Sequence, residues 1–495
     1  MTDAKPTARV DVVAKLWGYC HVLRHDGIGY QDYVMQLTYL IFLKMADERK
    51  IKLPPGCSWT ELKALNNSVL LDGEEDENER KLVKGYQDIL RTLARQATPL
   101  LKEVFTGATS LFRKAVSLRN LIELIDGQRW TAMGVDVKAE IYEGLLEKAA
   151  SEGKKGAGQY FTPRPLIRSI VRCMKPDPAE RAGFKLCDPA CGTGGFLVAA
   201  YEWWAAKARG GDVDRALAAR VRKGMFYGNE IGVDPRRLAV MNLVLHGVEP
   251  AITQGDSIYE NPSAERFDVV LTNPPFGTKG ADAAPEREDF LVETKNKQLN
   301  FVQHVMTVLR DGGRAAVVLP DNCLFGDQAG EVFKDLMAAY DLHTVIRLPR
   351  GTFTPYAQGV KANVIFFTRG SKTDRVWIYD ARTNVPGITK KSRPLTEAHF
   401  AEFERCFGAD PNGRSPRKTD DSKDDRWRSF TRDEVEAAGW KLDGFRWLKE
   451  EGVEDVDDLP EPDELLGEMM GDLEAALTGL KSLTKTLDAV EHGAP

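Results

Sequence analysis

Hydrophobic and polar positions repeat with two different periods along the chain. In residues 11–49 and 83–124, apolar side chains recur every three or four positions, as on one face of an α-helix. A stretch rich in Gly and Lys follows at residues 151–158, and beyond it short apolar runs alternate with helix-like segments. The pattern therefore predicts an all-helical N-terminal domain joined by a hinge to an α/β domain.

Eight short runs rich in apolar and β-branched residues predict the strands of this second domain. Between the second and third runs, a helix is marked by Asp234 as N-cap, Pro235 at its first position and Gly247 just past its end. Another helix is expected at residues 301–309. Because strands and helices alternate, we expect a doubly wound, mostly parallel α/β sheet of about seven strands. The runs are 184–188, 225–230, 251–256, 267–273, 314–319, 344–348, 363–367 and 376–379.

Composition excludes several classes of protein. The 495 residues are 42% hydrophobic and 29% charged, a balance typical of soluble proteins. The apolar runs are too short to span a bilayer, and residues 1–10 lack the apolar core of a signal peptide. The seven cysteines are scattered and odd in number, and no Cys/His set has zinc spacing. We therefore expect a cytoplasmic protein with reduced thiols, no membrane partner and no metal site.

The net charge of −6 argues at face value against a nucleic-acid partner. However, residues 450–474 contain twelve Asp or Glu and no Lys or Arg, which leaves +6 on the remainder of the chain. A body of this charge can bind phosphates weakly but cannot dominate a DNA interface by itself.

Polar side chains end the first four predicted strands, at Asp188, Glu230, Asp256 and Asn273. In open α/β sheets, ligands bind beyond the carboxyl ends of the strands, near the switch in strand order. A single carboxylate there most often caps the next helix, but four polar acceptors in succession favour a cofactor site.

A glycine-rich loop follows Asp188. Its glycines allow tight turns and close approach of the backbone to a ligand, and the helix that it opens presents amides suited to a carboxylate or phosphate. The spacing Gly-x-Gly-Gly differs from a dinucleotide fingerprint, and the chain has no P-loop sequence, so a P-loop motor is disfavoured. A purely structural strand-to-helix turn is the alternative. The loop residues are Gly192, Thr193, Gly194, Gly195 and Phe196.

The tetrapeptide Asn273, Pro274, Pro275 and Phe276 is the most specific signal in the chain. Its prolines restrict the backbone and remove two N–H donors, which leaves the Asn273 amide oxygen and the Pro274 carbonyl as neighbouring acceptors for an NH2 group. Two such hydrogen bonds would localise the lone pair of a conjugated amine, so that it can attack an electrophilic methyl group. Phe276 offers a ring for stacking a planar base flipped out of a duplex.

Together these motifs resemble those of the modification subunits of type I restriction-modification systems, which are adenine-N6 DNA methyltransferases that use S-adenosylmethionine. The resemblance extends to residues 37–49, 158–163 and 301–325 and to the acidic C-terminal helix, so it covers nearly the whole chain. It implies a Rossmann-like methyltransferase sheet, an N-terminal helical domain and a C-terminal helical tail. It also implies that the target adenine of double-stranded DNA is flipped out and that residues 273–276 are catalytic.

The resemblance also implies which residues bind the cofactor. Asp188 and the glycine loop would hold the methionine part, Glu230 would accept from the ribose hydroxyls, and Asp256 would read the adenine amine. An upstream element, in which Thr162 can cap a helix begun by Pro163, would contact the methionine part as well. The members of this element are Gln159, Tyr160, Phe161 and Thr162.

The chain lacks the large recognition domain that self-sufficient relatives carry after the catalytic core, which implies a separate DNA-specificity subunit. The C-terminal helix supports a partner independently, because its apolar residues follow a strict 3-4 spacing while three glycines weaken it. Packing on its own core is the alternative, and the presence of a restriction or motor subunit is left open. The apolar positions are Leu466, Met469, Leu473, Ala476, Leu480, Leu483, Leu487 and Val490.

We therefore expect four segments. They are a helical domain at 1–145, a catalytic domain at 146–385, a mixed extension at 386–455 with a mobile loop at 407–426, and a partner-binding, coiled-coil-like helix at 456–492.

Several alternatives stay open. Cytosine N4 and protein glutamine present the same conjugated NH2 group, and a noncatalytic scaffold would bind S-adenosylmethionine or DNA without turnover. A carboxylate–lysine pattern at Asp289, Glu293 and Lys295 faintly suggests a nuclease, but it lies in a polar loop. Basic residues at 164, 168, 172 and 175 either contact phosphates or form a solvated helix face.

Overall fold

The computed structural model describes residues 30–68, 75–130, 162–209, 214–276, 283–354, 359–389 and 392–448, together with residue 18 and some helical positions between 466 and 478. The chain divides into two compact units, Met1–Ala157 with Arg237–Glu249 and Gly158–Arg236 with Pro250–Pro495. These units are coarser than the four segments expected from the sequence, and that finer division stays a prediction.

The first unit is helical, as the period of its apolar residues predicts. The run at 83–124 forms parts of three helices and not one, because Pro99 opens α5 and Gly107, at φ +72°, follows its end. Asp126 ties α6 to other helices, since it accepts from Lys44 Nζ and from Trp59 Nε1, both at 2.9 Å. The helices are α2 (Tyr30–Glu48), α3 (Trp59–Ser68), α4 (Glu75–Gln96), α5 (Pro99–Phe105) and α6 (Ala115–Asp126), and α11 (Val233–Leu245) counts with this unit from Arg237 onward.

The second unit is built on a nine-stranded sheet with the order β3-β2-β1-β4-β5-β7-β6-β8-β9. The pairs β1–β2, β1–β4, β4–β5 and β6–β8 are parallel, whereas β7 is antiparallel to β5 and β6, and β9 to β8. The doubly wound, mostly parallel fold is thus confirmed. The strands are β1 (Leu186–Asp188), β2 (Lys223–Glu230), β3 (Glu249–Gln254), β4 (Phe267–Thr272), β5 (Leu309–Pro320), β6 (Tyr340–Arg347), β7 (Ala362–Arg369), β8 (Arg375–Asp380) and β9 (Trp427–Thr431).

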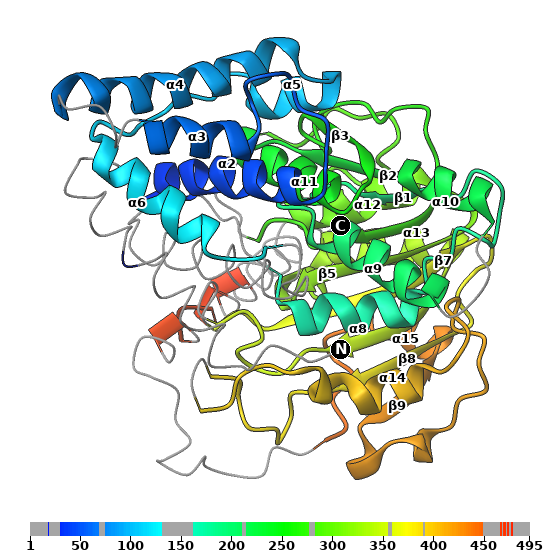
Figure 1. Cartoon of the computed structure of the whole chain (residues 1–495). Helices are drawn as coiled ribbons and strands as arrows, with labels where there is room; N and C mark the ends of the chain where they lie inside the picture. Colours follow the sequence, from blue (N-terminus) through cyan, green and yellow to red (C-terminus); the bar gives the residue numbers. More distant parts are fainter. Residues whose placement is uncertain are drawn as a thin grey trace. The chain divides into compact units, whose positions relative to one another are not determined.

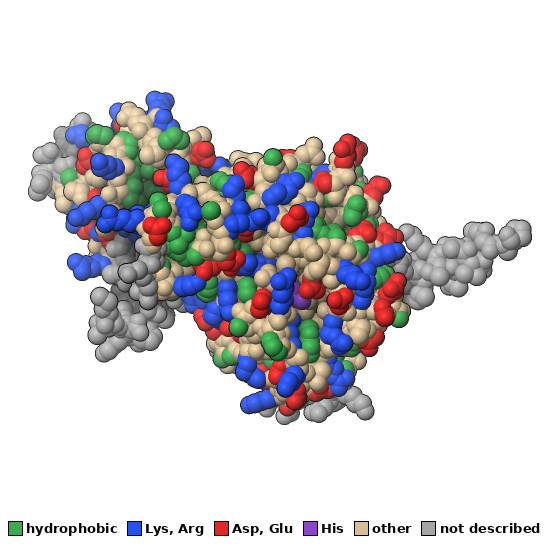
Figure 2. Space-filling model, turned by 90° about the vertical axis from the view of Figure 1, so that its right-hand side faces the viewer, with side chains coloured by type: hydrophobic (Ala, Val, Ile, Leu, Met, Phe, Trp, Pro, Cys, Tyr) green, Lys and Arg blue, Asp and Glu red, His purple; other side chains and the backbone are tan. Residues whose placement is uncertain are grey.

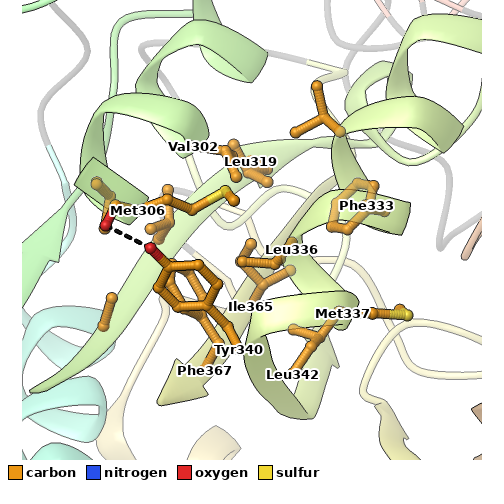
Figure 3. Close-up of a cluster of buried hydrophobic side chains, with 14 of the residues drawn as sticks. Val302, Met306, Leu319, Phe333, Leu336, Met337, Tyr340, Leu342, Ile365 and Phe367 are labelled. Carbon is orange, nitrogen blue, oxygen red and sulfur yellow. Dashed lines mark hydrogen bonds between the residues drawn. The ribbon is translucent and has the colours of Figure 1, made fainter. Parts of the chain in front are cut away.

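Helices cover both faces of this sheet (Figure 1). Val317 and Leu319 of β5 lie in a buried core with residues of α12 (Lys297–Val308) and α13 (Asp327–Ala339). Figure 3 shows this core, in which the Tyr340 hydroxyl donates to the Met306 carbonyl at 2.6 Å. Arg314, out of phase with those positions on β5, donates instead to the carbonyl that ends α8 (Arg164–Met174). Because alternate strand residues face opposite sides, α8 lies on the other face. The remaining helices are α9 (Gly195–Arg209), α10 (Arg215–Arg222), α14 (Ala401–Phe407) and α15 (Arg432–Ala437).

Two predicted helix starts are wrong by a few residues. Helix α11 begins at Val233, so Asp234 lies within its first turn and is not the residue that precedes it. Helix α12 begins at Lys297 and not at residue 301, because the Asn296 side chain caps it by accepting from two backbone amides. The predicted end of α11 holds, since Gly247 lies just past it with φ +77°.

The cap predicted for Thr162 is also wrong. Helix α8 begins at Arg164, with Pro163 as its N-cap residue and no side-chain cap. The Thr162 hydroxyl is engaged elsewhere, because it accepts a hydrogen bond from Asn273 Nδ2 at 2.9 Å.

The segment at 407–426, expected to be a mobile loop, contacts the sheet through Arg417. The guanidinium of Arg417 donates to the His343 carbonyl at 3.2 Å and to Thr344 Oγ1 at 2.9 Å, both on β6. It also donates to the Phe407 carbonyl and lies 5.5 Å from the centre of the Trp427 ring. One arginine therefore joins the segment to both β6 and the start of β9.

The six cysteines in the described ranges are free and buried. Within those same ranges, no helix has the length and apolar character that crossing a membrane requires.

Candidate functional site

The four predicted strand-end residues lie on neighbouring strands. The order of the sheet places β3, β2, β1 and β4 side by side. Asp188 and Glu230 are the last residues of β1 and β2, whereas Asp256 comes two residues after β3 and Asn273 one residue after β4. Since β1 is parallel to both β2 and β4, the carboxyl ends of these strands share one edge, at the switch in strand order.

Asp188 is a buried carboxyl group, with 2% of its surface exposed. Burial raises its pKa to about 7, although its Oδ1 accepts from the Ala190 amide at 3.1 Å. The Glu230 carboxylate raises the pKa of Asp188 further. A group placed in this way is only partly ionised at neutral pH, and a bound cation would favour its ionised form.

Glu230 is held by two backbone amides. Its Oε2 accepts from the Gly192 amide at 2.9 Å and its Oε1 from the Gly232 amide at 2.8 Å. Burial raises the pKa of Glu230, and the two amide bonds oppose this rise. Each oxygen keeps a second lone pair, so the carboxylate both anchors the glycine loop and can accept hydrogen bonds from a ligand.

The glycine loop uses backbone conformations that favour glycine. Gly192 and Gly194 have φ values of +53° and +82°. A Cβ added to Gly192 would meet no atom within 4 Å among the described residues, so the space beside this residue is open. Cys191 fixes the other side of the loop, because a Cβ on Gly228 of β2 would lie 3.1 Å from its sulfur.

The end of the loop packs toward α8. A Cβ on Gly195, where α9 begins, would lie 3.0 Å from Ile167 Cδ1 of α8. Thr193 is half-buried in the loop, and Phe196 is buried in the first turn of α9. The first turn of α8 therefore lies next to the end of the loop, and Thr162 precedes this turn by two residues.

The turn after β3 contains a residue that the sequence did not reveal. Asp256 Oδ1 accepts from the Ile258 amide at 3.0 Å, so this oxygen closes its own turn. The buried hydroxyl of Ser257 donates to the Pro189 carbonyl at 2.6 Å and accepts from Asn229 Nδ2 at 2.7 Å. Ser257 thereby links the ends of β1, β2 and β3, but a single serine in a turn carries no recognisable pattern.

The side-chain amide of Asn273 has one paired end and one unpaired end. Its Nδ2 donates to Thr162 Oγ1 at 2.9 Å. Its Oδ1 is buried, and no described residue supplies a hydrogen bond to it. An unpaired buried acceptor costs about 1–3 kcal/mol, a penalty that a bound N–H donor would remove.

Side chains from distant segments hold the rest of the Asn273–Phe276 turn. Pro274 is buried, and the carbonyl of the exposed Pro275 accepts from Gln298 Nε2 of α12 at 2.5 Å. Phe276 is 8% exposed and packs edge-to-face on Phe353, with ring centres 5.2 Å apart. Sequence analysis did not identify Gln298 or Phe353, because both lie far along the chain from the turn.

Arg287 connects the segment that follows this turn to the turn after β3. Its buried guanidinium donates to the Ser257 carbonyl at 2.6 Å and to both Asp289 oxygens, at 2.9 and 2.6 Å. It also lies 3.0 Å from His304 Nδ1, and burial together with the arginine charge lowers the pKa of His304 to about 3. Asp289, part of the weak nuclease pattern, is therefore occupied by Arg287, and Thr307 donates to it as well.

The remaining predicted residues either lie outside the described ranges or make contacts away from the strand ends. Gln159, Tyr160 and Phe161 lie outside the described residues. Arg168 and Arg172 of α8 form ion pairs with Glu397 and Glu404, at 2.6 to 3.0 Å. Both guanidinium groups are therefore already engaged in ion pairs. These pairs connect α8 to the segment after β8.

The apolar positions of the C-terminal helix are exposed where they are described. Leu466, Met469 and Leu473 have 60%, 60% and 66% of their surface exposed. The further positions of the apolar seam lie outside the described residues, namely Ala476, Leu480, Leu483, Leu487 and Val490.

Comparisons with known proteins identify the family of the chain. Residues 134–456 match the family model described as N-6 DNA Methylase. The chain is 38% identical to the StySPI methylase subunit of Salmonella potsdam, a type I restriction enzyme, over 97% of this chain and 96% of that protein. The EcoKI methylase subunit of Escherichia coli strain K12 gives the same identity and coverage.

Solved structures show the same likeness. The crystal structure of the type I restriction enzyme EcoKI M protein matches over 98% of this chain and 97% of its own, with 34% identity and a TM-score of 0.54. A structure described in terms of complex assembly and conformational transition of the type I restriction-modification system covers 98% of this chain and 99% of its own, with 27% identity and a TM-score of 0.69.

Proposed function

Because the chain belongs to the N-6 DNA methylase family and, within it, to the methylase subunits of type I restriction enzymes, we propose that it transfers a methyl group from S-adenosylmethionine to the N6 amine of adenine in DNA, as the modification subunit of such a complex. The turn of Asn273 to Phe276 carries this proposal. In it, a buried amide oxygen with no partner in the described part of the chain stands at the end of β4, next to the strand that ends in Asp188.

The residues at this edge of the sheet fit S-adenosylmethionine, which supplies an electrophilic methyl group when it is bound. Asp188 suits the cationic methionine part, because a nearby cation favours the ionised form of a buried carboxyl. Glu230 retains lone pairs for the two ribose hydroxyls. The open space at Gly192 would let the backbone approach a ligand closely, and Asp256, in the turn after β3, would read the adenine amine.

In the proposed reaction, Asn273 and Pro274 hold the amine of the target base. Asn273 Oδ1 and the Pro274 carbonyl accept the two protons of the N6 group. These hydrogen bonds draw the nitrogen lone pair out of conjugation with the ring and orient it toward the methyl group. As the nitrogen takes up the methyl group, the C–S bond of the sulfonium would break, and one N6 proton would pass to solvent, which leaves the product amine neutral.

Phe276 would supply the stacking face for the flipped adenine. Its edge-to-face packing on the fully buried Phe353 supports this role, because the contact fixes the plane of the ring. Base flipping is required, since the N6 group of a paired base is not accessible to the turn.

The apolar seam of the C-terminal helix is the proposed contact with a DNA-specificity subunit. The three described seam residues, Leu466, Met469 and Leu473, are mostly exposed and are spaced as in a helix-to-helix interface. Such a division of labour leaves sequence reading to the partner and methyl transfer to this chain.

A labelled-methyl assay tests the proposed function. The full-length chain, purified with and without its specificity subunit, is incubated with labelled S-adenosylmethionine and with genomic DNA, RNA or protein. We expect label only in DNA, as N6-methyladenine after digestion, and only with the specificity subunit at a defined sequence. Label as N4-methylcytosine or methylglutamine would establish one of the related chemistries, and cofactor binding without any transfer would indicate a scaffold.

A further inference from the structure

Two buried glutamines on α12 differ in how their amides are satisfied. Gln303 uses both ends, because its Oε1 accepts from the Val292 amide at 2.9 Å and its Nε2 donates to the Val292 carbonyl at 2.9 Å. Gln298 is 1% exposed and uses only its nitrogen, which donates to the Pro275 carbonyl at 2.5 Å. Its Oε1 is buried, and the described residues offer it no hydrogen bond.

The orientation of the Gln298 amide is fixed by its partner. The reverse orientation would place the Gln298 oxygen against the Pro275 carbonyl oxygen, and two acceptors repel each other. The backbone of Gln298 is fixed too, since its amide donates to the Asn296 side chain that caps α12. Gln298 therefore presents a rigid N–H donor to the turn.

An unpaired buried amide oxygen lowers the stability of the fold compared with an apolar side chain of the same shape. A buried polar atom without a partner calls for a physical reason, and a role at a functional site is one such reason. The feature here belongs to Gln298 of α12, whose nitrogen donates to the turn proposed to bind the target amine, whereas Gln303, about one and a half helical turns away, has no such atom.

The hydrogen bond from Gln298 to the Pro275 carbonyl restricts a backbone rotation that the proline rings leave free. The pyrrolidine rings fix φ of Pro274 and Pro275, so rotation about ψ is the main backbone freedom left to each residue. A hydrogen bond to the Pro275 carbonyl fixes ψ of Pro275 and the path of the chain into Phe276. We propose that Gln298 is a positioning residue for methyl transfer, which acts by holding the Asn273–Phe276 turn in the conformation that receives the target base.

This inference rests on the proposed function and is tested in the complex with the specificity subunit. The variants are Gln298→Met, which keeps the shape and removes the donor, and Gln298→Glu, assayed at alkaline pH so that its ionised carboxylate places an acceptor against the Pro275 carbonyl. The matched control is Gln303→Met, the same change on the same helix at a glutamine whose partner, Val292, lies outside the turn.

We expect Gln298→Met to lower kcat at least about tenfold, because small misplacements of reacting groups are costly, and Gln298→Glu to lower it further. The KM for S-adenosylmethionine and the melting temperature should change little in Gln298→Met. Fluorescence of 2-aminopurine at the target position should report less of the flipped state. Gln303→Met should show the opposite pattern, with a lower melting temperature and nearly normal kcat at a temperature where it is folded.

Two results would overturn the inference. One is a Gln298→Met complex with wild-type kcat and 2-aminopurine signal, and the other is a loss of kcat that merely parallels a loss of melting temperature, as in Gln303→Met. Transfer by the wild-type complex in the same assay tests the proposed function separately, so the inference can fail while the function stands.

Discussion

Asn273 illustrates how a single side chain can be anchored and available at once. Its nitrogen is bound to Thr162 at the start of α8, and its oxygen is buried without a partner in the described residues. Anchoring one end of an amide reduces the conformational entropy that is lost when the other end binds a ligand. The pairing therefore suits an acceptor that must be in place before the base arrives.

We expect Asn273→Ala to lower kcat by about 10²-fold or more, the usual effect of removing one preorganised hydrogen-bonding group from a reacting centre. Affinity for S-adenosylmethionine should be nearly unchanged, because Asn273 is assigned to the base. Single-turnover rates and calorimetry measure the two quantities. Thr162→Val is the matched variant, since it removes the anchor and keeps the acceptor, and it should lose less activity. A loss of cofactor binding as large as the catalytic loss would contradict the assignment.

Burial raises the pKa of Asp188 to about 7, and if Asp188 holds the cofactor as proposed, cofactor binding should depend on pH. The ionised form attracts a cation, so the contribution of Asp188 to affinity should grow as the pH rises through 7 and the carboxyl loses its proton. The ionised fraction rises about tenfold from one pH unit below the pKa to one unit above it. The ratio of wild-type to Asp188→Asn affinity, measured by calorimetry at both pH values, should rise accordingly. Taking the ratio cancels titration of the ligand itself, and a ratio that does not vary with pH would remove Asp188 from this role.

Site residues at the ends of strands could be predicted from the sequence, whereas residues whose side chains connect one loop to another could not. Asp188, Glu230 and Asn273 each follow an apolar run, and the rule for ligand sites in α/β sheets then groups them. Ser257 and Arg287 act on partners 68 and 30 positions away, the Pro189 and Ser257 carbonyls. Such pairs are created by tertiary folding and leave no spacing in the sequence.

At the scale of elements, the interiors of strands and helices and several of their ends were predictable, whereas the starts of α8, α11 and α12 were not. All eight predicted runs overlap β1 to β8, because buried apolar residues mark them. The ninth strand, Trp427–Thr431, was missed, since only Trp427 is buried in this edge strand and the other side chains are half-buried. The early start of α12 depends on the Asn296 cap, one residue within a polar stretch.

The loop between β1 and α9 gives a prediction about an element. Gly194 has φ +82°, and a β-branched residue in such a conformation costs at least about 1–2 kcal/mol, so Gly194→Val should reshape the loop. Calorimetry should show weaker binding of S-adenosylmethionine. Gly183→Val is the matched control, because Gly183 has φ +73° just before β1, outside the loop. We expect the two variants to lose similar amounts of melting temperature and only Gly194→Val to bind S-adenosylmethionine more weakly. An equal loss of cofactor affinity in both variants would contradict the assignment of the loop to the cofactor site.

At the scale of the whole molecule, the charge distribution indicates that a partner subunit contributes to DNA binding. Figure 2 shows Lys and Arg interspersed with Asp and Glu over the face in view. Arg168 and Arg172, which the sequence left as candidates for phosphate contacts, are paired with Glu397 and Glu404. Because DNA affinity grows with the number of phosphates neutralised, the isolated chain should bind DNA weakly and with little sequence preference.

The exposed seam residues of the C-terminal helix allow the division of labour to be tested directly. Replacing Leu466, Met469 and Leu473 together by Asp should abolish assembly with the specificity subunit and site-specific methylation, because charged residues cannot be buried unpaired in a helix-to-helix interface. Binding of S-adenosylmethionine should persist, since the proposed pocket is built from other segments. Deletion of residues 460–495 should have the same effect.

Thr478→Glu provides the matched control, because it adds charge to the same helix at a position outside the seam, where the hydroxyl contacts only the Glu474 carbonyl among the described residues. Size-exclusion chromatography with light scattering measures assembly, and methylation of a single-site duplex measures recognition. The triple variant should elute as an uncomplexed chain that still binds the cofactor, whereas Thr478→Glu should assemble normally. If the triple variant assembled and methylated its site as the wild type does, the partner would have to bind elsewhere on this chain. If the uncomplexed chain methylated one defined sequence, sequence recognition would have to lie within this polypeptide.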